Sequence, residues 1–444
     1  MTSRGATSEA PRPRVVITGV GVVCSLGRTS GELWEAIEAG RSGIGPITRF
    51  DAAGFTTRIA AEVPDAGERD TRFDGAYWSG LDLRSRFAVS AALSAIQGAG
   101  LSFTPQNRGQ VAVVMASERP EEELLLAGAR SLIAGDVAGA AATLAAHARP
   151  HAPADRIAAL FGTTGPVLQV ENRSAGGLNA IIEAADMIRR GDALVAIAGG
   201  AEAPITPLTV AAFQGTGALS TRNDDPAGAS RPLDEGRDGF VLGEGAAVVT
   251  LEAIEVAHAR GATILAEVEG EGMTFSPGAS GTPAMDATQI GQALQLALVS
   301  SGRIQAEVDV LALHAAGSVE GDRIEALGVR RIFGAATRHH LYTPALKGHT
   351  GHLLGASGPL TLAVMLEAMY RGKVPPTLNL EREDPQVDLD GNAAGVREEH
   401  VLVAIVNATG WAHNAAIVLA HPRAMRRFDP PEEDDVLAIP DESI

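Results

Sequence analysis

Short apolar runs alternate with segments of helical spacing along most of the chain. The runs are rich in β-branched residues and bounded by glycine, which is typical of buried strands. In the first half we expect strands at residues 14–23, 110–116, 167–170, 193–198 and 246–252. Apolar residues every three or four positions predict helices at residues 32–40, 84–99, 121–146 and 178–190. Gly191 follows the last of these helices and is suited to end it in a left-handed conformation.

The second half repeats this rhythm. Strands are expected at residues 264–270, 308–313, 402–407 and 415–420, and helices at 253–260, 288–301, 320–333 and 360–371. Strands that alternate with helices indicate covered, mostly parallel sheets. The similar halves suggest a duplication, with parts at residues 14–258 and 259–421, a polar N-terminus at 1–13 and an acidic tail at 422–444. We expect both ends to be mobile.

Composition narrows the class of protein. The net charge of −18 over 444 residues argues against nucleic acid or an anionic membrane as the main partner. No apolar stretch is long enough to span a membrane, and residues 1–13 lack the apolar core of a signal peptide, so we expect a cytoplasmic protein. The single cysteine, Cys24, excludes a disulfide framework. The histidines lack zinc-site spacing, so no metal is predicted.

One charged segment stands out, RPLDEGRDGFVLGEG at residues 231–245. Charges this dense beside glycine usually mark a surface loop. The segment also closely resembles the RPFDxxRDGFVxGEG signature of the β-ketoacyl-ACP synthases, the condensing enzymes of fatty acid and polyketide assembly. HAAGSVEGDRIE at 314–325 and KGHTGHLLGASG at 347–358 resemble two further motifs of that family. The resemblance implies an α/β fold, the thiolase-like duplicated five-layered α/β/α/β/α sandwich.

The resemblance also implies a reaction. In this family a cysteine thiolate at a helix N-terminus takes up the acyl group, and two histidines bind the thioester carbonyl of malonyl-carrier protein. A lysine and a glutamate hold those histidines. Carried over, the histidines are His314 and His352, and their supports are Lys347 and Glu325. Lys347 is one of only two lysines in the sequence. No bound cofactor is expected, because the phosphopantetheine arm of acyl carrier protein delivers the substrate.

The nucleophile departs from the family pattern. Where the family has a segment such as VDTACSSGL, this chain has VENRSAGGL at residues 170–178, which places Ser174 at the cysteine position. A serine hydroxyl has a pKa far above that of a thiol and needs an adjacent general base. His314 or His352 is the candidate base. Cys24 leaves the first strand, where a small buried apolar residue is the simpler interpretation.

Two further segments resemble chain-length factors, the ketosynthase-β subunits that lack the nucleophile and pair with an active ketosynthase. These are AGGLNA at residues 175–180 and TGWAHN at 409–414, the latter in place of a GFGGxN gate. The threonines of the family's histidine motif are replaced by Ala316 and Ser318. Ser318, Thr409 and Gly410 remain the candidate contacts for the phosphopantetheine arm and the oxyanion loop. Typical chain-length factors have lost both histidines, whereas this chain keeps them.

Three functions therefore stay open. The first is a ketosynthase-β subunit that pairs with an active ketosynthase and shapes its acyl tunnel. The second is a condensing or acyl-transfer enzyme acylated on Ser174, and the third is a decarboxylase of malonyl-carrier protein. A contact of roughly 3 Å between Ser174 and a histidine would favour the second. The resemblance implies a heterodimer or homodimer that extends the sheet across an edge strand, here 193–198. It also implies an arginine patch that binds the acidic acyl carrier protein.

Overall fold

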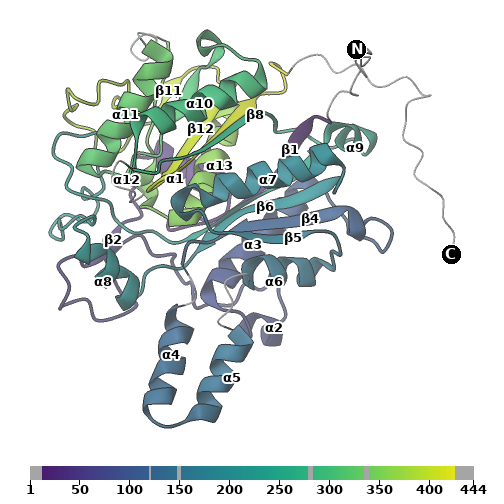
Figure 1. Ribbon diagram of the computed structural model, residues 1–444, viewed down its shortest axis with the longest axis vertical. Coiled ribbons are helices and arrows are strands. Elements are labelled where there is room, and N and C mark those ends of the chain that lie inside the picture. The colour runs from purple at the N-terminus through teal and green to yellow at the C-terminus, as the bar shows by residue number, and fades with distance from the viewer. Residues whose placement is uncertain (1–12, 120–121, 148–151, 279–283, 335–339, 426–444) are drawn as a thin grey trace, which may run out of the picture.

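One continuous mixed sheet runs through the molecule (Figure 1). The computed structural model describes residues 13–119, 122–147, 152–278, 284–334 and 340–425. Nine strands pair in the order β5-β4-β6-β7-β1-β8-β13-β12-β9. Their bounds are β1 (Val15–Val23), β4 (Val111–Ala116), β5 (Val167–Val170), β6 (Val195–Glu202), β7 (Gly245–Ala253), β8 (Ala266–Phe275), β9 (Val310–Ala312), β12 (Val403–Gly410) and β13 (His413–Ala420).

The order of the strands shows the duplication. Counting outward from the centre, the first half reads β1-β7-β6-β4-β5, and the second reads β8-β13-β12-β9 followed by Tyr342, which bridges to Val310 in parallel. The halves meet where Val16 and Ile17 of β1 pair with β8. Each half therefore carries the same topology.

The prediction of mostly parallel sheets is wrong. Only β4/β5, β4/β6 and β9/β12 pair in parallel, and the other five neighbouring pairs of this sheet are antiparallel. An apolar run shows that both faces of a strand are covered, but it carries no information on direction. The short connection between β12 and β13, through Trp411 and Ala412, permits only an antiparallel pair.

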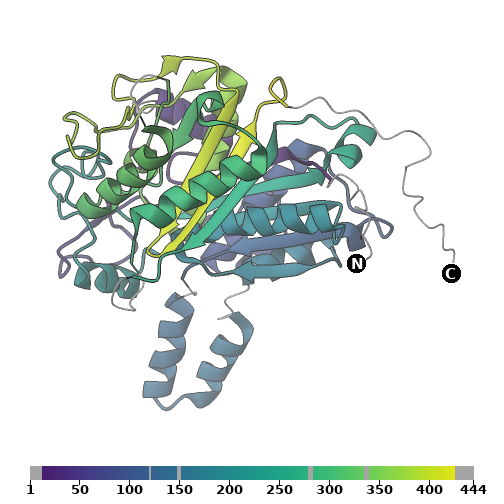
Figure 2. The same ribbon diagram turned by 45° about the horizontal axis from the view of Figure 1, so that its top comes forward.

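Helices complete the five layers. Helices α7 (Gly176–Arg190) and α13 (Ser357–Arg371) lie between the two halves of the sheet, α7 against β4, β6 and β13 and α13 against β7 and β12. Helices α3 (Leu83–Ala99) and α6 (Ala152–Phe161) cover the outer face of the first half, and α10 (Ala287–Ser301) and α11 (Val319–Phe333) cover that of the second (Figure 2). The predicted thiolase-like α/β sandwich is confirmed.

The remaining elements are short or peripheral. They are the helices α1 (Ser30–Glu38), α2 (Gly75–Ser79), α4 (Glu122–Ile133), α5 (Val137–His147), α8 (Pro207–Gly215), α9 (Ile254–Ala259) and α12 (Lys347–Thr350), the strands β2 (Gly45–Pro46), β3 (Ile59–Ala60), β10 (Lys373–Val374) and β11 (Arg397–Glu398), and the 3-10 turns η1 (Arg108–Gln110), η2 (Arg173–Ala175), η3 (Gln305–Glu307) and η5 (Leu354–Ala356). No helix in the described ranges is both long and apolar enough to cross a membrane.

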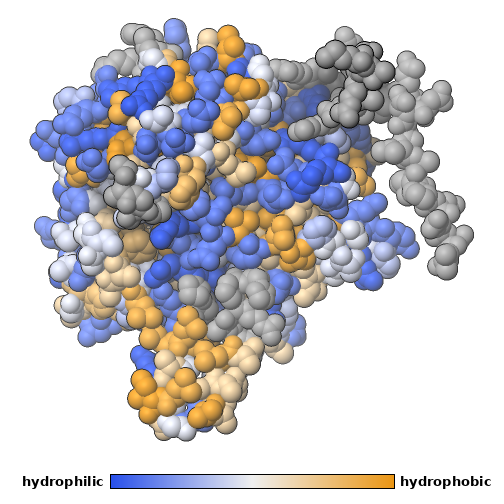
Figure 3. Space-filling model, in the orientation of Figure 1, coloured by the Kyte–Doolittle hydropathy of each residue, from blue (hydrophilic) through white to orange (hydrophobic). Residues whose placement is uncertain are grey.

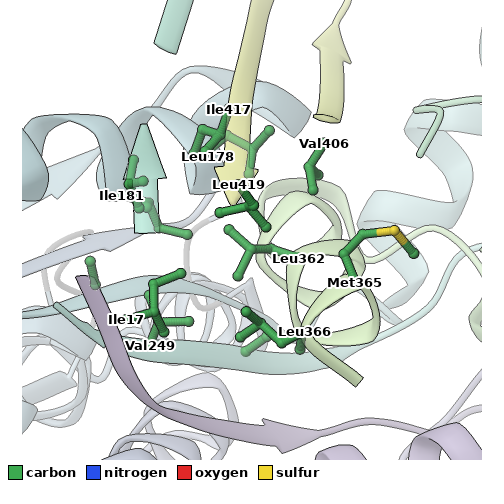
Figure 4. Packing of buried hydrophobic residues seen from close by; sticks show 14 of the residues in the cluster. Ile17, Leu178, Ile181, Val249, Leu362, Met365, Leu366, Val406, Ile417 and Leu419 are labelled. Atoms are coloured by element: carbon green, nitrogen blue, oxygen red, sulfur yellow. The ribbon is translucent and has the colours of Figure 1, made fainter. Parts of the chain in front are cut away.

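The central core packs around α7 and α13. Leu178 of α7 and Leu362 of α13 meet Ile17, Val249 and Ile417 from both halves of the sheet (Figure 4). Gly177 lets the start of α7 approach η5 and α13. A Cβ at Gly177 would lie 2.3 Å from the carbonyl oxygen of Gly355, so the close approach depends on glycine.

Two local predictions change. The helical stretch 121–146 is split into α4 and α5, because Gly135 turns left-handed (φ +80°) and Asp136 accepts the N–H of Gly139 to begin a new helix. This hairpin projects from the rest of the molecule and carries an apolar surface (Figure 3).

The expected edge strand, 193–198, corresponds to β6, an interior strand between β4 and β7, so that prediction is wrong. The edge of this half is β5.

The division at residue 258 stays a prediction. Residues 1–12 and 426–444, which make up most of the two end segments expected to be mobile, lie outside the described residues.

Candidate active site

Three neighbouring parallel strands bring their carboxyl ends together at one edge of the core. Strand β4 lies between β5 and β6 in the same direction. Glu118 follows β4, Ser174 follows β5, and Glu202 is the last residue of β6. Ser174 lies in η2, directly before α7, so the N-terminus of a 15-residue helix begins beside its side chain. This end of the sheet is the candidate site.

Ser174 is buried between a histidine and a carboxylate. Its Oγ lies 3.2 Å from Nε2 of His352 and 3.5 Å from Oε2 of Glu118. The tip of β12 covers it, because a Cβ at Gly410 would be only 2.6 Å from the backbone nitrogen of Ser174. The structure thus brings together Ser174, His352 and Gly410, all of which the sequence singled out.

The hydrogen bonds of His352 define its tautomer. The backbone N–H of Leu354 donates to Nδ1 at 3.2 Å, and Ser357 Oγ lies 2.9 Å from the same atom. Because an N–H group cannot accept, Nδ1 must offer a lone pair, and in the neutral ring the proton is on Nε2. Burial lowers the pKa of His352 well below its usual value, so the neutral ring is the relevant form. Nε2 therefore donates to Ser174 Oγ.

His314 is held through its backbone. Glu325 accepts the N–H groups of His314 and Ala315, each at 2.7 Å, and Asn407 Nδ2 donates to the same carboxylate at 2.6 Å. Lys347 Nζ donates to the carbonyl oxygen of His314. Burial lowers the pKa of Lys347 and raises that of Glu325.

The rings of His314 and His352 lie next to each other, with the edge of one toward the face of the other. Their centroids are 5.2 Å apart and the planes are inclined by 79°. Burial, with a smaller contribution from the charge of Lys347, lowers the pKa of both rings well below the usual value. Two neutral imidazoles can donate N–H groups to one carbonyl oxygen, which is the arrangement that stabilises an enolate.

The signature at residues 231–245 is largely buried rather than a surface loop, with Glu235 and Asp238 as its exposed residues. Arg237 binds Asp384 at 2.9 Å and lies 3.6 Å from Asp322, and its side chain is 1% exposed. The end of the segment pairs with the loop that carries His352, called the histidine loop below. The N–H of His352 donates to the carbonyl oxygen of Val241 at 2.7 Å. These residues therefore hold the site in shape, which explains why so dense a run of charge is tolerated in the interior.

The remaining predicted residues occupy different places. Thr409 is buried, and its Oγ1 has no hydrogen-bond partner within the described part of the chain. Ser318 is partly buried at the start of α11, where its carbonyl oxygen accepts from Arg237 Nε at 3.3 Å. Cys24 leaves β1, paired with Gly27, and burial raises its pKa to about 11. No group of three or more His, Cys, Asp or Glu side chains suited to a metal ion occurs among the described residues.

Glu118, Arg173 and Glu202 belong to the site but were not among the predicted residues. Glu202 accepts the backbone N–H of Glu118 and Gly355, the latter at 3.3 Å. Arg173 Nη1 lies 3.6 Å from Glu118 Oε1, and Arg173 has a left-handed backbone (φ +49°). For Glu118, the available signal was a charged residue two positions after the buried run 110–116.

Comparisons with known proteins agree with this geometry. The family model described as "Beta-ketoacyl synthase, N-terminal domain" matches residues 12–257, and the corresponding C-terminal domain matches residues 265–381. The chain is 37% identical over 424 residues to 3-oxoacyl-[acyl-carrier-protein] synthase 2 of Coxiella burnetii, covering 92% of this chain and 98% of the relative. It is 33% identical to the tetracenomycin ketoacyl synthase alpha subunit of Streptomyces glaucescens, covering 93% and 98%.

Solved structures give the same result. The ishigamide ketosynthase/chain length factor superposes with a TM-score of 0.83 at 31% identity, covering 92% of this chain and 99% of that one. A β-ketoacyl synthase from Burkholderia phymatum reaches 0.84 at 30% identity with the same coverage. Family models over most of the chain, full-length relatives and matching folds together show that this chain belongs to the β-ketoacyl synthase family.

Proposed function

We propose that this chain is a ketosynthase-β, or chain-length-factor, type subunit of type II polyketide or fatty acid assembly, which pairs with an active ketosynthase. The direction of one hydrogen bond carries the proposal. The distance of 3.2 Å between Ser174 and His352 is within reach of a nucleophile and its base. Nε2 of His352 already carries the proton, so it donates to the hydroxyl and cannot accept from it. A helix N-terminus alone does not ionise a serine.

Strand β5 supports the pairing. Among the described residues β5 pairs with β4 alone, and Leu168 on it is 41% exposed. An uncovered edge is a template for a strand of another chain, and two-fold pairing across such an edge is a common route to dimers. The similarity to a ketosynthase/chain length factor favours a ketosynthase as that partner.

Co-production with the cognate ketosynthase tests the pairing. We expect a one-to-one complex by size-exclusion chromatography and mass measurement, and loss of the complex in Leu168→Arg. Val299→Arg is the matched control, because Val299 is an equally apolar side chain on α10 that is 67% exposed. A stable homodimer of this chain that condenses acyl and malonyl groups without a partner would contradict the proposal.

We expect the phosphopantetheine arm of acyl carrier protein to enter this site. The unpartnered hydroxyl of Thr409 is suited to an amide of the arm, with Ser318 and Gly410 as further candidate contacts. A related ketosynthase structure, 25% identical, is described as a complex with its acyl carrier protein. We expect Thr409→Val to weaken binding of holo-carrier protein while leaving binding of apo-carrier protein, which lacks the arm, unchanged.

A second candidate function is decarboxylation of malonyl-carrier protein. The observation that favours it is the pair of neutral imidazoles, His314 and His352, with rings 5.2 Å apart. Their N–H groups would bind the thioester oxygen, the carboxylate would leave as CO₂, and the enolate would take a proton from water to give the acetyl thioester. Release of CO₂ that is lost in His352→Ala and kept in His400→Ala, an exposed control, is the result required. Equal rates in both variants would exclude this reaction.

A further inference from the structure

We infer that Glu118 is an electrostatic block at the nucleophile position, which keeps residue 174 unacylated whether a hydroxyl or a thiol stands there. This inference rests on the proposed function and deepens it, since it names a second residue that disables the site. The serine at position 174 would then be only half of the reason why the site takes up no acyl group.

The position of the Glu118 carboxylate is fixed by its neighbours. Its backbone N–H donates to Glu202 at the end of β6, and the next N–H, of Arg119, lies 3.4 Å from the same carboxylate. These contacts tie the turn after β4 to the adjacent strand. The side chain, only 8% exposed, is thereby directed at Ser174 rather than at solvent.

Ser174 accepts on one side and donates on the other. His352 Nε2 donates to its Oγ, so the hydroxyl proton is free to point to Glu118 Oε2, 3.5 Å away. Replacing the hydroxyl by a thiolate would place two negative charges at this distance inside the protein. Like charges that close raise a thiol pKa, and burial leaves little water to screen them.

The other groups around position 174 include some that stabilise a negative charge on residue 174 and some that do not. The N-terminus of α7 and the guanidinium of Arg173 favour a negative charge, and His352 is a neutral donor. Arg173 is 56% exposed and touches Glu118 at 3.6 Å, so it offsets the carboxylate only in part. Glu202 accepts the backbone N–H of Glu118, and burial raises the pKa of Glu202 to about 8. Glu118 is thus the group that decides whether a thiolate is tolerated.

The alternative role of Glu118, as a general base for Ser174, is less consistent with the contacts. A separation of 3.5 Å is at the outer limit of a hydrogen bond. Burial raises the pKa of Glu118, and the nearby charge of Arg173 opposes that rise and so works against proton uptake from the hydroxyl. An acyl transfer would also build an oxyanion next to the carboxylate, where its charge would be repelled.

Thiol chemistry in the full-length protein separates these roles. Ser174→Cys and Ser174→Cys/Glu118→Gln are alkylated with iodoacetamide across pH, and the rate gives the pKa of the introduced thiol. We expect the pKa to fall by about one unit or more in the double variant, and the rate at pH 7 to rise about tenfold. Ser174→Cys/Glu171→Gln is the matched control, since Glu171 is a nearby but exposed carboxylate that should change the rate little.

Two further variants keep the result interpretable. Adding Arg173→Ala to Ser174→Cys should raise the thiol pKa, because it removes the compensating charge. Glu118→Ala should reproduce the effect of Glu118→Gln, and thermal unfolding of each variant verifies that it is folded. An unchanged thiol pKa in both Glu118 variants would overturn the inference.

Acylation is the second readout. Intact-mass measurement after incubation with acyl-carrier protein should show an adduct on Ser174→Cys/Glu118→Gln and none on the wild type. An adduct on the wild type that disappears in Glu118→Gln would make Glu118 a base and refute the block. The pairing assay with the ketosynthase reports on the proposed function separately, because it needs neither Glu118 nor a thiol.

Discussion

Replacing Arg237 by methionine would leave two buried aspartates short of their counter-charge. The guanidinium donates to Asp384 at 2.9 Å and lies 3.6 Å from Asp322, with the side chain 1% exposed. It also donates to the carbonyl oxygens of Asp234 at 2.7 Å, Val319 at 2.8 Å and Ser318 at 3.3 Å. The variant would therefore lose one ion pair, one nearby counter-charge and three backbone contacts together.

The expected loss of unfolding free energy is about 3 kcal/mol. Removing one partner of a buried pair costs about 3–5 kcal/mol, because the other charge stays buried without compensation. The lower end applies here, since Asp384 keeps Arg323 as a partner at 2.9 Å. Arg382→Met is the matched control. Arg382 lies 3.7 Å from Glu235 with its side chain 68% exposed, and such surface pairs contribute about 1 kcal/mol at most.

The loss should depend on pH in a defined direction. Without Arg237 the pKa of Asp322, already raised by burial, rises further above its unfolded value. The folded variant then binds more protons than the unfolded chain, so its deficit shrinks as the pH falls from about 7 to 5. Urea unfolding followed by tryptophan fluorescence measures both effects. A deficit under about 1 kcal/mol, or one equal to that of the control, would refute the reasoning.

Three further outcomes are expected. Gly177→Ala should destabilise the protein by about 2 kcal/mol, because its Cβ would lie 2.3 Å from the carbonyl oxygen of Gly355, whereas Gly98→Ala, with nothing within 4 Å, should stabilise α3 slightly in the same unfolding assay. ¹⁵N NMR of labelled histidine should show His352 protonated on Nε2 and bare on Nδ1 from pH 6 to 8, and the opposite tautomer would remove the main support for an inactive serine. Cys24 should resist iodoacetamide in the folded protein at pH 8 and react in urea, because burial raises its pKa to about 11; rapid labelling of the folded chain would show that the turn after β1 is not buried as described.

The layered fold could be predicted from the pattern of apolar residues, but the relative direction of neighbouring strands could not. The apolar runs at 14–23, 110–116 and 193–198 are confirmed as β1, β4 and β6 within a few residues, because full burial of both strand faces leaves a continuous apolar run. The same burial is satisfied by a parallel or an antiparallel neighbour. For that reason the prediction of a mostly parallel sheet was wrong. The edge position of 193–198 came from the family resemblance, and it was wrong because β6 lies between β4 and β7.

The sequence alone determined which side chains stand at the family's positions. It placed Ser174 where a cysteine is usual and kept His314, His352, Lys347 and Glu325, because these are matters of residue identity at motif spacing. It also indicated the duplication, because the same alternation of apolar strands and helices recurs in the two halves of the sequence.

Only the tertiary structure decided which side chains contact the hydroxyl of Ser174. Glu118 and His352 lie 56 and 178 residues from it along the chain, and they reach its hydroxyl because β4 and β5 end side by side and the histidine loop pairs with residues 241–243. The proton position on His352 follows from the N–H of Leu354, a backbone contact that no motif records. Whether a hydroxyl is activated or held depends on the direction of hydrogen bonds, and that direction exists only once distant segments are packed together.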